Sequence, residues 1–358
     1  MIDVLVAGGG PAGCAAALFL AKHGFSVTLA DAETPRDFKI GETVPPDIQK
    51  PLREIGALQS FLDDSHPCSP GICSIWGDRE PVYRDGFNQP LGGGWRLDRA
   101  RFDASLLDQV GKRGIDVLRR TRVVDAERAG QGWNVTLAGS EMALRADFLI
   151  DATGRSGSLS RRLGASRFTF DTLIAAYALL PMEEGRRGHA VIEATEEGWW
   201  YAADLGHDRA VVALFTDADL ARRQRLSDAA TWRRLYRQTT QIARHDVSST
   251  CQKIGIAPAA THIMSQTSGP GWLAVGDAAS SWDPLKSAGI TLALRSGIEG
   301  AQAVIRYCSR YPNALPEYDS QLRRRFTQYL VERRQYYAIE NRWPASVFWS
   351  RRSNLRAA

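Results

Sequence analysis

The start of the chain alternates apolar and glycine-rich stretches in a fixed order. Residues 2–7 are apolar with one polar interruption, which predicts a buried parallel strand. Residues 8–13 are rich in glycine and predict a turn, and the small and apolar residues that follow predict a helix that Gly24 ends. Residues 25–31 predict a second strand that ends in an acid. This order predicts a βαβ unit at the start of an α/β fold.

The remaining pattern predicts further helices and a second sheet. Apolar positions recur at helical spacing in residues 48–55, and Asp47 is the expected cap of this helix. The same spacing predicts a helix at residues 98–112, with Asp98 as its cap. Polar and apolar residues alternate from 168 to 216, which predicts an antiparallel sheet. We expect helices also at residues 227–244, 290–307 and 317–341, and strands at residues 116–119, 122–128, 133–137, 148–151 and 271–275.

Length and composition are those of a globular protein. The 358 residues suggest about two domains, and 44% hydrophobic with 24% charged residues is an ordinary balance. We expect no transmembrane segment, no secretory signal peptide and a cytoplasmic location. The five cysteines are scattered, and Cys68 and Cys73 have no second pair to complete a zinc site. We therefore expect free thiols and no metal.

Charge is concentrated at the carboxy terminus. The net charge is +5, only six of the 45 cationic residues are lysines, and nine arginines fall between Arg323 and Arg356. Glu332 and Glu340 are the only acids in that segment. Such a segment fits either an acidic partner or a solvated helix, and both interpretations remain open. We expect no nucleic-acid partner.

The opening turn has the residues that a dinucleotide-binding site needs. Gly8 permits a tight turn, Gly10 lets the backbone approach a pyrophosphate, and Gly13 lets helix and strand pack closely. The amino terminus of the helix offers unpaired N–H groups to phosphates. Asp31, at the end of the second strand, is placed to accept ribose hydroxyls.

Two later segments repeat the step from apolar strand to glycine turn. They are Asp151-Ala152-Thr153-Gly154 and Gly276-Asp277-Ala278-Ala279. With the opening turn they resemble the flavoprotein monooxygenases of the para-hydroxybenzoate hydroxylase fold, a superfamily that includes flavin-dependent halogenases and geranylgeranyl-reductase-like proteins. The resemblance implies FAD as the cofactor. It also implies an α/β fold with a glutathione-reductase-type, Rossmann-like FAD-binding domain, an inserted antiparallel-sheet substrate domain and carboxy-terminal helices.

The resemblance assigns cofactor contacts along the chain. Asp277 binds the ribityl side of FAD, Pro284 lies against the isoalloxazine, and the Ser287-Ala288-Gly289 turn meets the pyrimidine edge. Arg99 contacts the phosphates or ribose, and the backbone at Val124 meets the adenine. The remaining expected FAD contacts flank these motifs and the opening turn: Pro11, Ala12, Ala32, Lys39 and Gly276.

The expected domain division is discontinuous. Residues 1–66, 97–165 and 270–310 form the FAD-binding domain, and residues 67–96 with 166–269 form the substrate domain. Residues 311–358 form a helical segment.

Two segments bear on the branch of the superfamily. Residues 39–46, the strap, contain a Gly-Glu-Thr that resembles the strap of the halogenases, and residues 283–289, the flavin loop, resemble their flavin loop. However, the Trp-x-Trp-x-Ile-Pro of tryptophan halogenases is missing, because residues 198–203 read Gly-Trp-Trp-Tyr-Ala-Ala. The lysine that directs hypohalous acid is missing too, since no lysine lies between Lys50 and Lys112. We therefore expect ring hydroxylation.

Three stretches resemble a narrower group, the flavoproteins that mature tryptophylquinone cofactors by hydroxylating a tryptophan of a partner protein. They are residues 69–77, 94–103 and 336–344. This resemblance implies a polypeptide substrate that bears a tryptophan. Small-molecule tryptophan or phenol hydroxylases, other halogenase-like enzymes, a geranylgeranyl-reductase-like oxidoreductase and a non-catalytic flavin-binding protein remain alternatives.

A monooxygenase of this type needs a group that raises the electron density of the ring, because the flavin hydroperoxide is an electrophile. Glu42 and Lys286 are the titratable residues that the motifs place nearest, so Glu42, Lys286 and Pro284 are the candidate catalytic residues. Each titratable residue has a structural alternative: Glu42 anchors the strap, or Lys286 pairs with Asp283. The electron donor is either NADPH or a separate flavin reductase.

Overall fold

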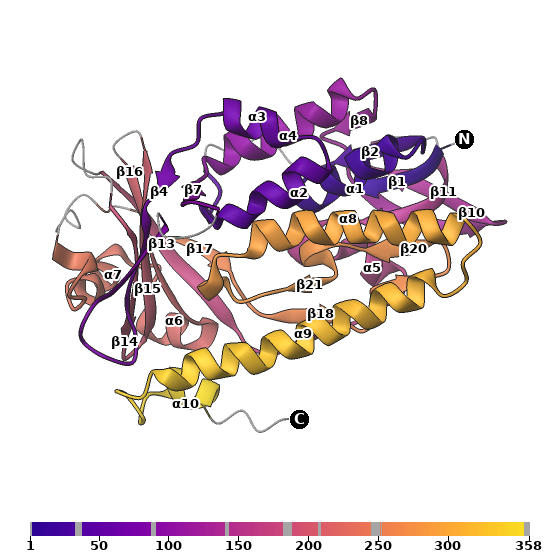
Figure 1. The fold of residues 1–358 in the computed structure, drawn as a ribbon. Coiled ribbons are helices and arrows are strands. Elements are labelled where there is room, and N and C mark those ends of the chain that lie inside the picture. The colour runs from indigo at the N-terminus through magenta and orange to yellow at the C-terminus, as the bar shows by residue number, and fades with distance from the viewer. Residues whose placement is uncertain are drawn as a thin grey trace.

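The computed structural model describes residues 2–32, 38–86, 91–139, 143–181, 188–206, 209–244, 251 and 253–353. Figure 1 shows two main bodies, with the first sheet and its helices on the right and a second sheet on the left. The long carboxy-terminal helix runs beneath both.

An eight-stranded sheet forms the first body, with a parallel centre in the order β20-β11-β1-β2-β8. Ala7 of β1 pairs with Asp151 of β11 and with Ala30 of β2, so these strands end side by side. The strands are β1 (Ile2–Ala7), β2 (Val27–Asp31), β8 (Asp116–Arg119), β9 (Val123–Ala129), β10 (Gly132–Leu137), β11 (Leu144–Asp151), β19 (Ser268–Gly269) and β20 (Trp272–Ala274).

Small residues let two helices lie very close beside this sheet. The helices are α1 (Pro11–Lys22) and α8 (Gly289–Cys308). A Cβ at Gly297 would lie 2.2 Å from the Ala12 carbonyl oxygen, so only glycine permits this approach. Helices α2 (Gln49–Glu54), α3 (Leu58–Asp63), α4 (Arg99–Lys112) and α5 (Ser158–Arg162) complete this body.

The second body is a seven-stranded sheet in the order β17-β13-β16-β15-β14-β5-β6. Every pair is antiparallel except β14 with β5. One face packs into a core with Trp199, and the other packs Trp200 against α7. The elements are β5 (Gly71–Ile75), β6 (Val82–Asp85), β13 (Leu173–Pro181), β14 (Ala190–Thr195), β15 (Gly198–Gly206), β16 (Arg209–Asp217), β17 (Gly255–Pro258), α6 (Ala218–Gln224) and α7 (Ala229–Tyr236).

Two small sheets lie between these bodies. One has the order β3-β7-β4, and the other has the order β12-β18-β21. Thr43 of the strap pairs with Arg96 in the first of them. Their strands are β3 (Thr43–Val44), β4 (Cys68–Ser69), β7 (Gly94–Arg96), β12 (Arg167–Thr169), β18 (His262–Met264) and β21 (Ser280–Ser281).

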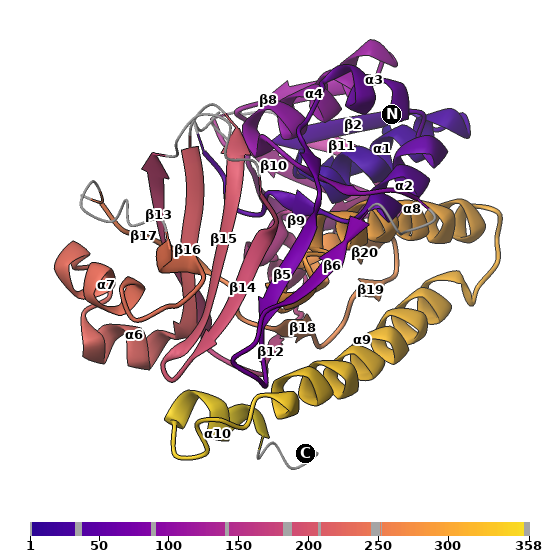
Figure 2. The same ribbon diagram turned by 60° about the vertical axis from the view of Figure 1, so that its left-hand side comes forward.

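The carboxy-terminal helices connect the two bodies (Figure 2). Helix α9 (Ala314–Ile339) places Leu322 and Phe326 in the core of the first body. Its last turns place Tyr337 in the core of the second, together with Phe348 of α10 (Val347–Ser353). The helical segment therefore belongs to both cores.

Most predicted elements are confirmed, and the exceptions have local causes. The helix expected at 227–244 ends at Tyr236, and a single turn follows at Ile242–Arg244. Asp98 caps α4 by accepting the N–H of Arg101. Asp47 does not cap a helix; it lies in the turn Pro46–Ile48 and forms an ion pair with Arg295. The short helices α3, α5, α6 and α10 were not predicted, because elements of five to seven residues show too little periodicity.

Candidate functional site

The opening turn is packed at two of its glycines and open at the third. Gly8 has φ +117°, and a Cβ there would lie 2.2 Å from the Ala152 carbonyl oxygen. A Cβ at Gly13 would lie 1.9 Å from the Gly8 carbonyl oxygen. At Gly10, by contrast, no atom lies within 4 Å of the Cβ position. The backbone is thus tightly packed behind the turn and accessible in front of it.

The start of α1 is chemically suited to an anion. No side chain caps it, its first turn has no acidic residue, and Pro11 occupies a position where no N–H is needed. The unpaired N–H groups of such a terminus bind phosphate. Asp31 Oδ1 accepts the Gly9 N–H at 3.1 Å, which places the carboxylate beside the turn, and the exposed Ala32 follows it. The residues present therefore fit a dinucleotide.

The other two motifs meet this turn. Asp151 is fully buried and accepts the Thr153 and Ser160 N–H groups, so it fixes the second turn from inside. A Cβ at Gly276 would lie 2.7 Å from the Ala12 Cβ, which places the Gly276-Asp277 turn against the start of α1.

Asp277 itself is partly accessible. Its Oδ2 lies 3.4 Å from Arg155 Nε, and 38% of its side chain is exposed. A cavity of about 40 Å³ between this turn, α8 and α9 is lined by three predicted cofactor residues, Gly276, Asp277 and Gly289.

Arg99 and Lys39 converge on one carboxylate that the sequence analysis did not single out. Asp103 lies 3.1 Å from Arg99 Nη2 and 2.8 Å from Lys39 Nζ. The spacing of four residues between Arg99 and Asp103 on α4 was the available signal. Val124 lies on β9, just after Thr121, whose N–H donates to the Asp31 carbonyl. The structure thus brings the start of β9 to the same end of the sheet as the turn.

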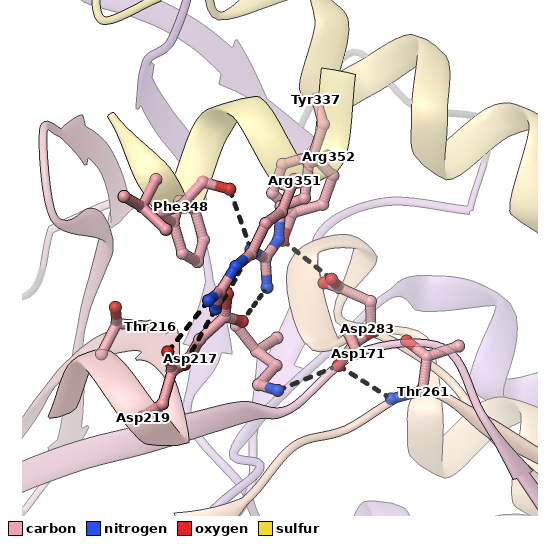
Figure 3. Close-up of polar contacts among 12 residues, drawn as sticks. Asp171, Thr216, Asp217, Asp219, Thr261, Asp283, Tyr337, Phe348, Arg351 and Arg352 are labelled. Atoms are coloured by element: carbon pink, nitrogen blue, oxygen red, sulfur yellow. Dashed lines mark hydrogen bonds and ion pairs between the residues drawn. The ribbon is translucent and has the colours of Figure 1, made fainter. Parts of the chain in front are cut away.

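The flavin loop is fixed by α9 (Figure 3). Asp283 Oδ1 accepts the Leu285 N–H, and its Oδ2 accepts from the Tyr337 hydroxyl at 2.8 Å and from Arg333 Nε at 3.2 Å. Arg333 also pairs with Asp171 at 2.7 Å, so one buried guanidinium joins two carboxylates.

The other residues of the flavin loop form a tight turn next to Asp283. Pro284 starts the turn Pro284–Lys286, and Ser287 follows at φ +50°. Ala288 precedes α8, and no atom lies within 4 Å of the Cβ position of Gly289.

Lys286 does not pair with Asp283, contrary to the structural alternative considered above. Its Nζ lies 2.5 Å from Glu332 Oε2 and 5.0 Å from the centre of the Tyr336 ring. The two residues meet different sides of α9: Asp283 contacts the buried Arg333 and Tyr337, whereas Lys286 contacts the more accessible Glu332 and Tyr336. Glu332 and Tyr336 are one turn apart on that side.

Glu42 is a buried carboxylate on the strap. It is 2% exposed, and its Oε1 accepts the Gly41 N–H at 2.9 Å. Burial raises the pKa of Glu42 to about 7, although the backbone N–H groups and Arg99 oppose this shift. Such a carboxyl changes charge near neutral pH, as a general base must.

Tyr201 of β15 is a neighbour that the sequence analysis missed. Its hydroxyl lies 2.6 Å from Thr43 Oγ1, so the sheet is joined to the strap one residue from Glu42. Burial raises the pKa of Tyr201, and the Glu42 charge raises it further. The contact of Tyr201 with the strap was not predicted, because the Trp199-Trp200-Tyr201 run is also typical of an ordinary sheet core. Ile40 of the strap and Leu285 of the flavin loop both pack against the core that contains Tyr201.

A metal site and a membrane-spanning helix are both absent from the described ranges. There, no group of three or more His, Cys, Asp or Glu side chains is arranged to hold a metal ion. Within the same ranges, no helix has the length and apolar character needed to cross a membrane. All five cysteines are free thiols, as expected.

The fold and these turns define a flavoprotein of the hydroxylase and halogenase type, and comparison with known proteins agrees. The family described as "FAD binding domain" matches residues 1–333, and the chain belongs to this family. FAD is the cofactor, and the protein is an FAD-dependent oxidoreductase. The open backbone at Gly10 and the uncapped start of α1 suit this cofactor.

Similar proteins cover almost the whole chain. The protein described as "Putative FAD-dependent oxidoreductase LodB", from Marinomonas mediterranea, is 32% identical over 99% of this chain and 98% of its own length. The structure of the flavin-dependent halogenase CmlS superposes with a TM-score of 0.87 at 25% identity, over 99% of this chain and 68% of that one. QhpG, described as a peptidyl tryptophan dihydroxylase essential for tryptophylquinone cofactor biogenesis, superposes with a TM-score of 0.80 at 22% identity, over 99% of this chain and 80% of that one. At that identity, the likeness to QhpG shows the fold alone.

Proposed function

We propose that this protein is an FAD-dependent monooxygenase that hydroxylates a tryptophan side chain of a partner polypeptide. The observation that carries the hydroxylation is Glu42, a buried carboxyl on the strap with a pKa raised to about 7. The polypeptide substrate rests on the resemblance of residues 69–77, 94–103 and 336–344 to enzymes that mature tryptophylquinone cofactors. The electron donor in this proposal is NADPH or a separate flavin reductase.

The chain's own residues have distinct tasks in this reaction. FAD, when bound and reduced, supplies the activated oxygen. Glu42, once ionised, accepts a hydrogen bond from the ring N–H or O–H of the substrate and so raises the electron density of the ring. Tyr201 and Thr43 position the strap, and the buried aromatic core behind them excludes water. Pro284 and the backbone of the flavin loop position the isoalloxazine.

The lysines of the site favour hydroxylation over halogenation. A directing amine must be free to carry the oxidant to the substrate. Lys39 Nζ lies 2.8 Å from Asp103 and Lys286 Nζ lies 2.5 Å from Glu332, so each ammonium already has a carboxylate partner. Neither lysine is therefore placed to relay hypohalous acid.

Mass spectrometry after turnover tests the proposal. The FAD-loaded protein is supplied with NADPH, with and without a flavin reductase, in the presence of bromide and ¹⁸O₂. Tryptophan-bearing peptides, free tryptophan and a phenol are compared as substrates. We expect ¹⁸O in the peptide tryptophan and no bromine. A brominated product would show that Lys39 or Lys286 serves as the relay, and faster turnover of free tryptophan or phenol would favour a small-molecule hydroxylase.

A further inference from the structure

The arginines of the carboxy-terminal segment are mostly structural. Six of the nine form ion pairs with carboxylates: Arg323, Arg325, Arg333, Arg342, Arg351 and Arg352. Arg356 lies outside the described residues. Arg324 and Arg334 are exposed, and within the described ranges neither has an ion-pair partner. In the described part of this segment, the uncompensated charge is therefore that of two side chains.

These two arginines share a face of α9 with two exposed apolar residues. Helical geometry places Arg324 and Val331 along the middle of the outer side of the helix, with Arg334 and Ile339 on its two flanks. The opposite side carries buried residues such as Phe326, Arg333 and Tyr337. Val331 is 49% and Ile339 is 53% exposed. We call these four residues the docking stripe.

Exposed apolar side chains are concentrated here. In the described ranges twelve large hydrophobic residues are exposed, and four of them, Val331, Tyr336, Ile339 and Val347, lie in the stretch 331–347. Single exposed apolar residues are ordinary on a monomer, but a group of them mixed with arginine is typical of protein interfaces. The composition of this face is therefore that of a surface that meets another polypeptide.

The docking stripe is continuous with the flavin loop. Tyr336 borders it, and Lys286 of the flavin loop lies over the Tyr336 ring. Trp76 Nε1 donates to the Tyr336 carbonyl at 2.8 Å, and the Gly77 N–H donates to Glu340 Oε2 at 2.8 Å. Two stretches that the sequence analysis singled out, 69–77 and 336–344, thus join at this edge.

We propose that the docking stripe binds an acidic, partly apolar segment of the partner polypeptide next to the flavin loop. This inference rests on the proposed function and adds the surface and the chemistry of recognition. Arg324 and Arg334 attract carboxylates and mainly raise the association rate, whereas Val331 and Ile339 lose water on binding and slow dissociation. A basic segment would be repelled.

Peptide binding to the oxidised, FAD-loaded protein tests the proposal without turnover. The probes are a fluorescein-labelled peptide with one tryptophan among glutamates and leucines, and a counterpart with lysines in place of the glutamates. Fluorescence anisotropy is measured over a range of salt concentrations. We expect the acidic peptide to bind, and Arg324→Glu with Arg334→Glu to weaken it about tenfold at low salt, with the difference shrinking as salt rises.

Matched variants identify the surface. Arg222→Glu with Arg223→Glu reverses two exposed arginines of α6 and should leave binding unchanged. Val331→Ser with Ile339→Ser should weaken binding at every salt concentration. Equal loss in the α6 variant, or no loss in either stripe variant, would overturn the docking stripe.

The two proposals fail in different ways. Hydroxylation of the acidic peptide that is equally fast in the wild type and in both stripe variants would reject the stripe and leave the proposed function standing. Stripe-dependent binding with no oxygen transfer to any tryptophan would reject the proposed function and leave the docking surface standing.

Discussion

At the scale of single residues, the site depends on which positions are packed and which are open. Gly8 and Gly13 are packed against backbone oxygens, whereas Gly10 faces open space. The three glycines of the same motif therefore have different tasks. Two of them permit the fold, and the third permits the cofactor to approach.

Substitutions at two of these glycines should separate folding from FAD binding. Gly10 has φ −72° and ψ 179°, which valine also adopts, so Gly10→Val should fold normally and lose FAD because its side chain occupies the pyrophosphate path. Gly13→Ala should lose about 1–3 kcal/mol of folding free energy or more, because its Cβ would meet the Gly8 carbonyl oxygen. Urea unfolding of the FAD-free proteins and titration of flavin fluorescence measure the two effects. Tight FAD binding by Gly10→Val would refute the assignment of this turn.

Glu42 should make the stability of the FAD-free protein depend on pH. Its pKa is raised from the ordinary 4.5 to about 7, so the folded protein binds more protons than the unfolded chain between these values. Stability must then fall as pH rises through this window, by on the order of 3 kcal/mol, and level off above it.

The variant Glu42→Gln should remove this component. As pH rises from about 4.5 to about 7, the wild type should lose unfolding free energy relative to the Glu42→Gln variant, which lacks the titrating carboxyl. Urea unfolding at several pH values is the measurement. Parallel curves for the two proteins would mean that Glu42 is ionised throughout and is not poised as a base.

At the scale of elements, α9 determines the position of the flavin loop. Tyr329, Arg333 and Tyr337 lie on successive turns, and each makes a hydrogen bond to Asp283. Trp199 Nε1 donates to the Tyr337 hydroxyl at 3.0 Å, so the same helix also connects the loop to the second sheet. Within the loop, Asp283 Oδ1 accepts the Leu285 N–H, and the three side chains of α9 hold Asp283 in place, so the position of the loop depends on α9.

Two adjacent arginines of α9 should differ sharply in their contribution to stability. Arg333→Met would leave Asp171 and Asp283 buried without a cation and should cost about 3–5 kcal/mol. Arg334→Met removes an exposed arginine and should change stability by less than about 0.5 kcal/mol. Urea unfolding of both variants, with FAD titration of the folded fraction, compares them directly. Similar small losses would show that the buried pair is dispensable.

Sequence patterns predicted the elements that depend on local order. The strands β1, β2 and β8 and the cap of α4 follow from periodicity and from residues that are neighbours along the chain. The glycine turns and Asp277 were also predicted, and the structure brings them together at the start of α1.

The missed residues depend on partners that are distant in the sequence. Tyr201 is 158 positions from Thr43, and Tyr337 is 138 positions from Trp199. Nothing in the local sequence of either tyrosine indicates which surface will face it. Asp103 is an intermediate case: its spacing of four residues from Arg99 was a local signal, but its second partner, Lys39, is 64 positions away.

At the scale of the whole molecule, the carboxy-terminal segment connects two separate cores. Phe326 of α9 packs in the first core, whereas Tyr337 and Trp349 pack in the second. Helix α10 binds the end of this segment to the second sheet. Trp349 Nε1 donates to the Thr195 carbonyl at 2.7 Å. Arg351 and Arg352 both pair with the buried Asp217. Loss of α10 should therefore affect the flavin loop through Tyr337, which packs near Trp349 and donates a hydrogen bond to Asp283.

A chain that ends at Pro344 tests this connection. Without α10, Asp217 loses both arginines, and Tyr337 loses the Trp349 ring 5.9 Å away. We expect a loss of at least about 3 kcal/mol in unfolding free energy, and weaker FAD binding because Tyr337 no longer fixes Asp283. A chain that ends at Ser353 retains α10 and is the control. If the shorter chain lost stability but bound FAD as tightly as the control, the flavin loop would be positioned by α9 alone, and the two cores would be independent at the cofactor site.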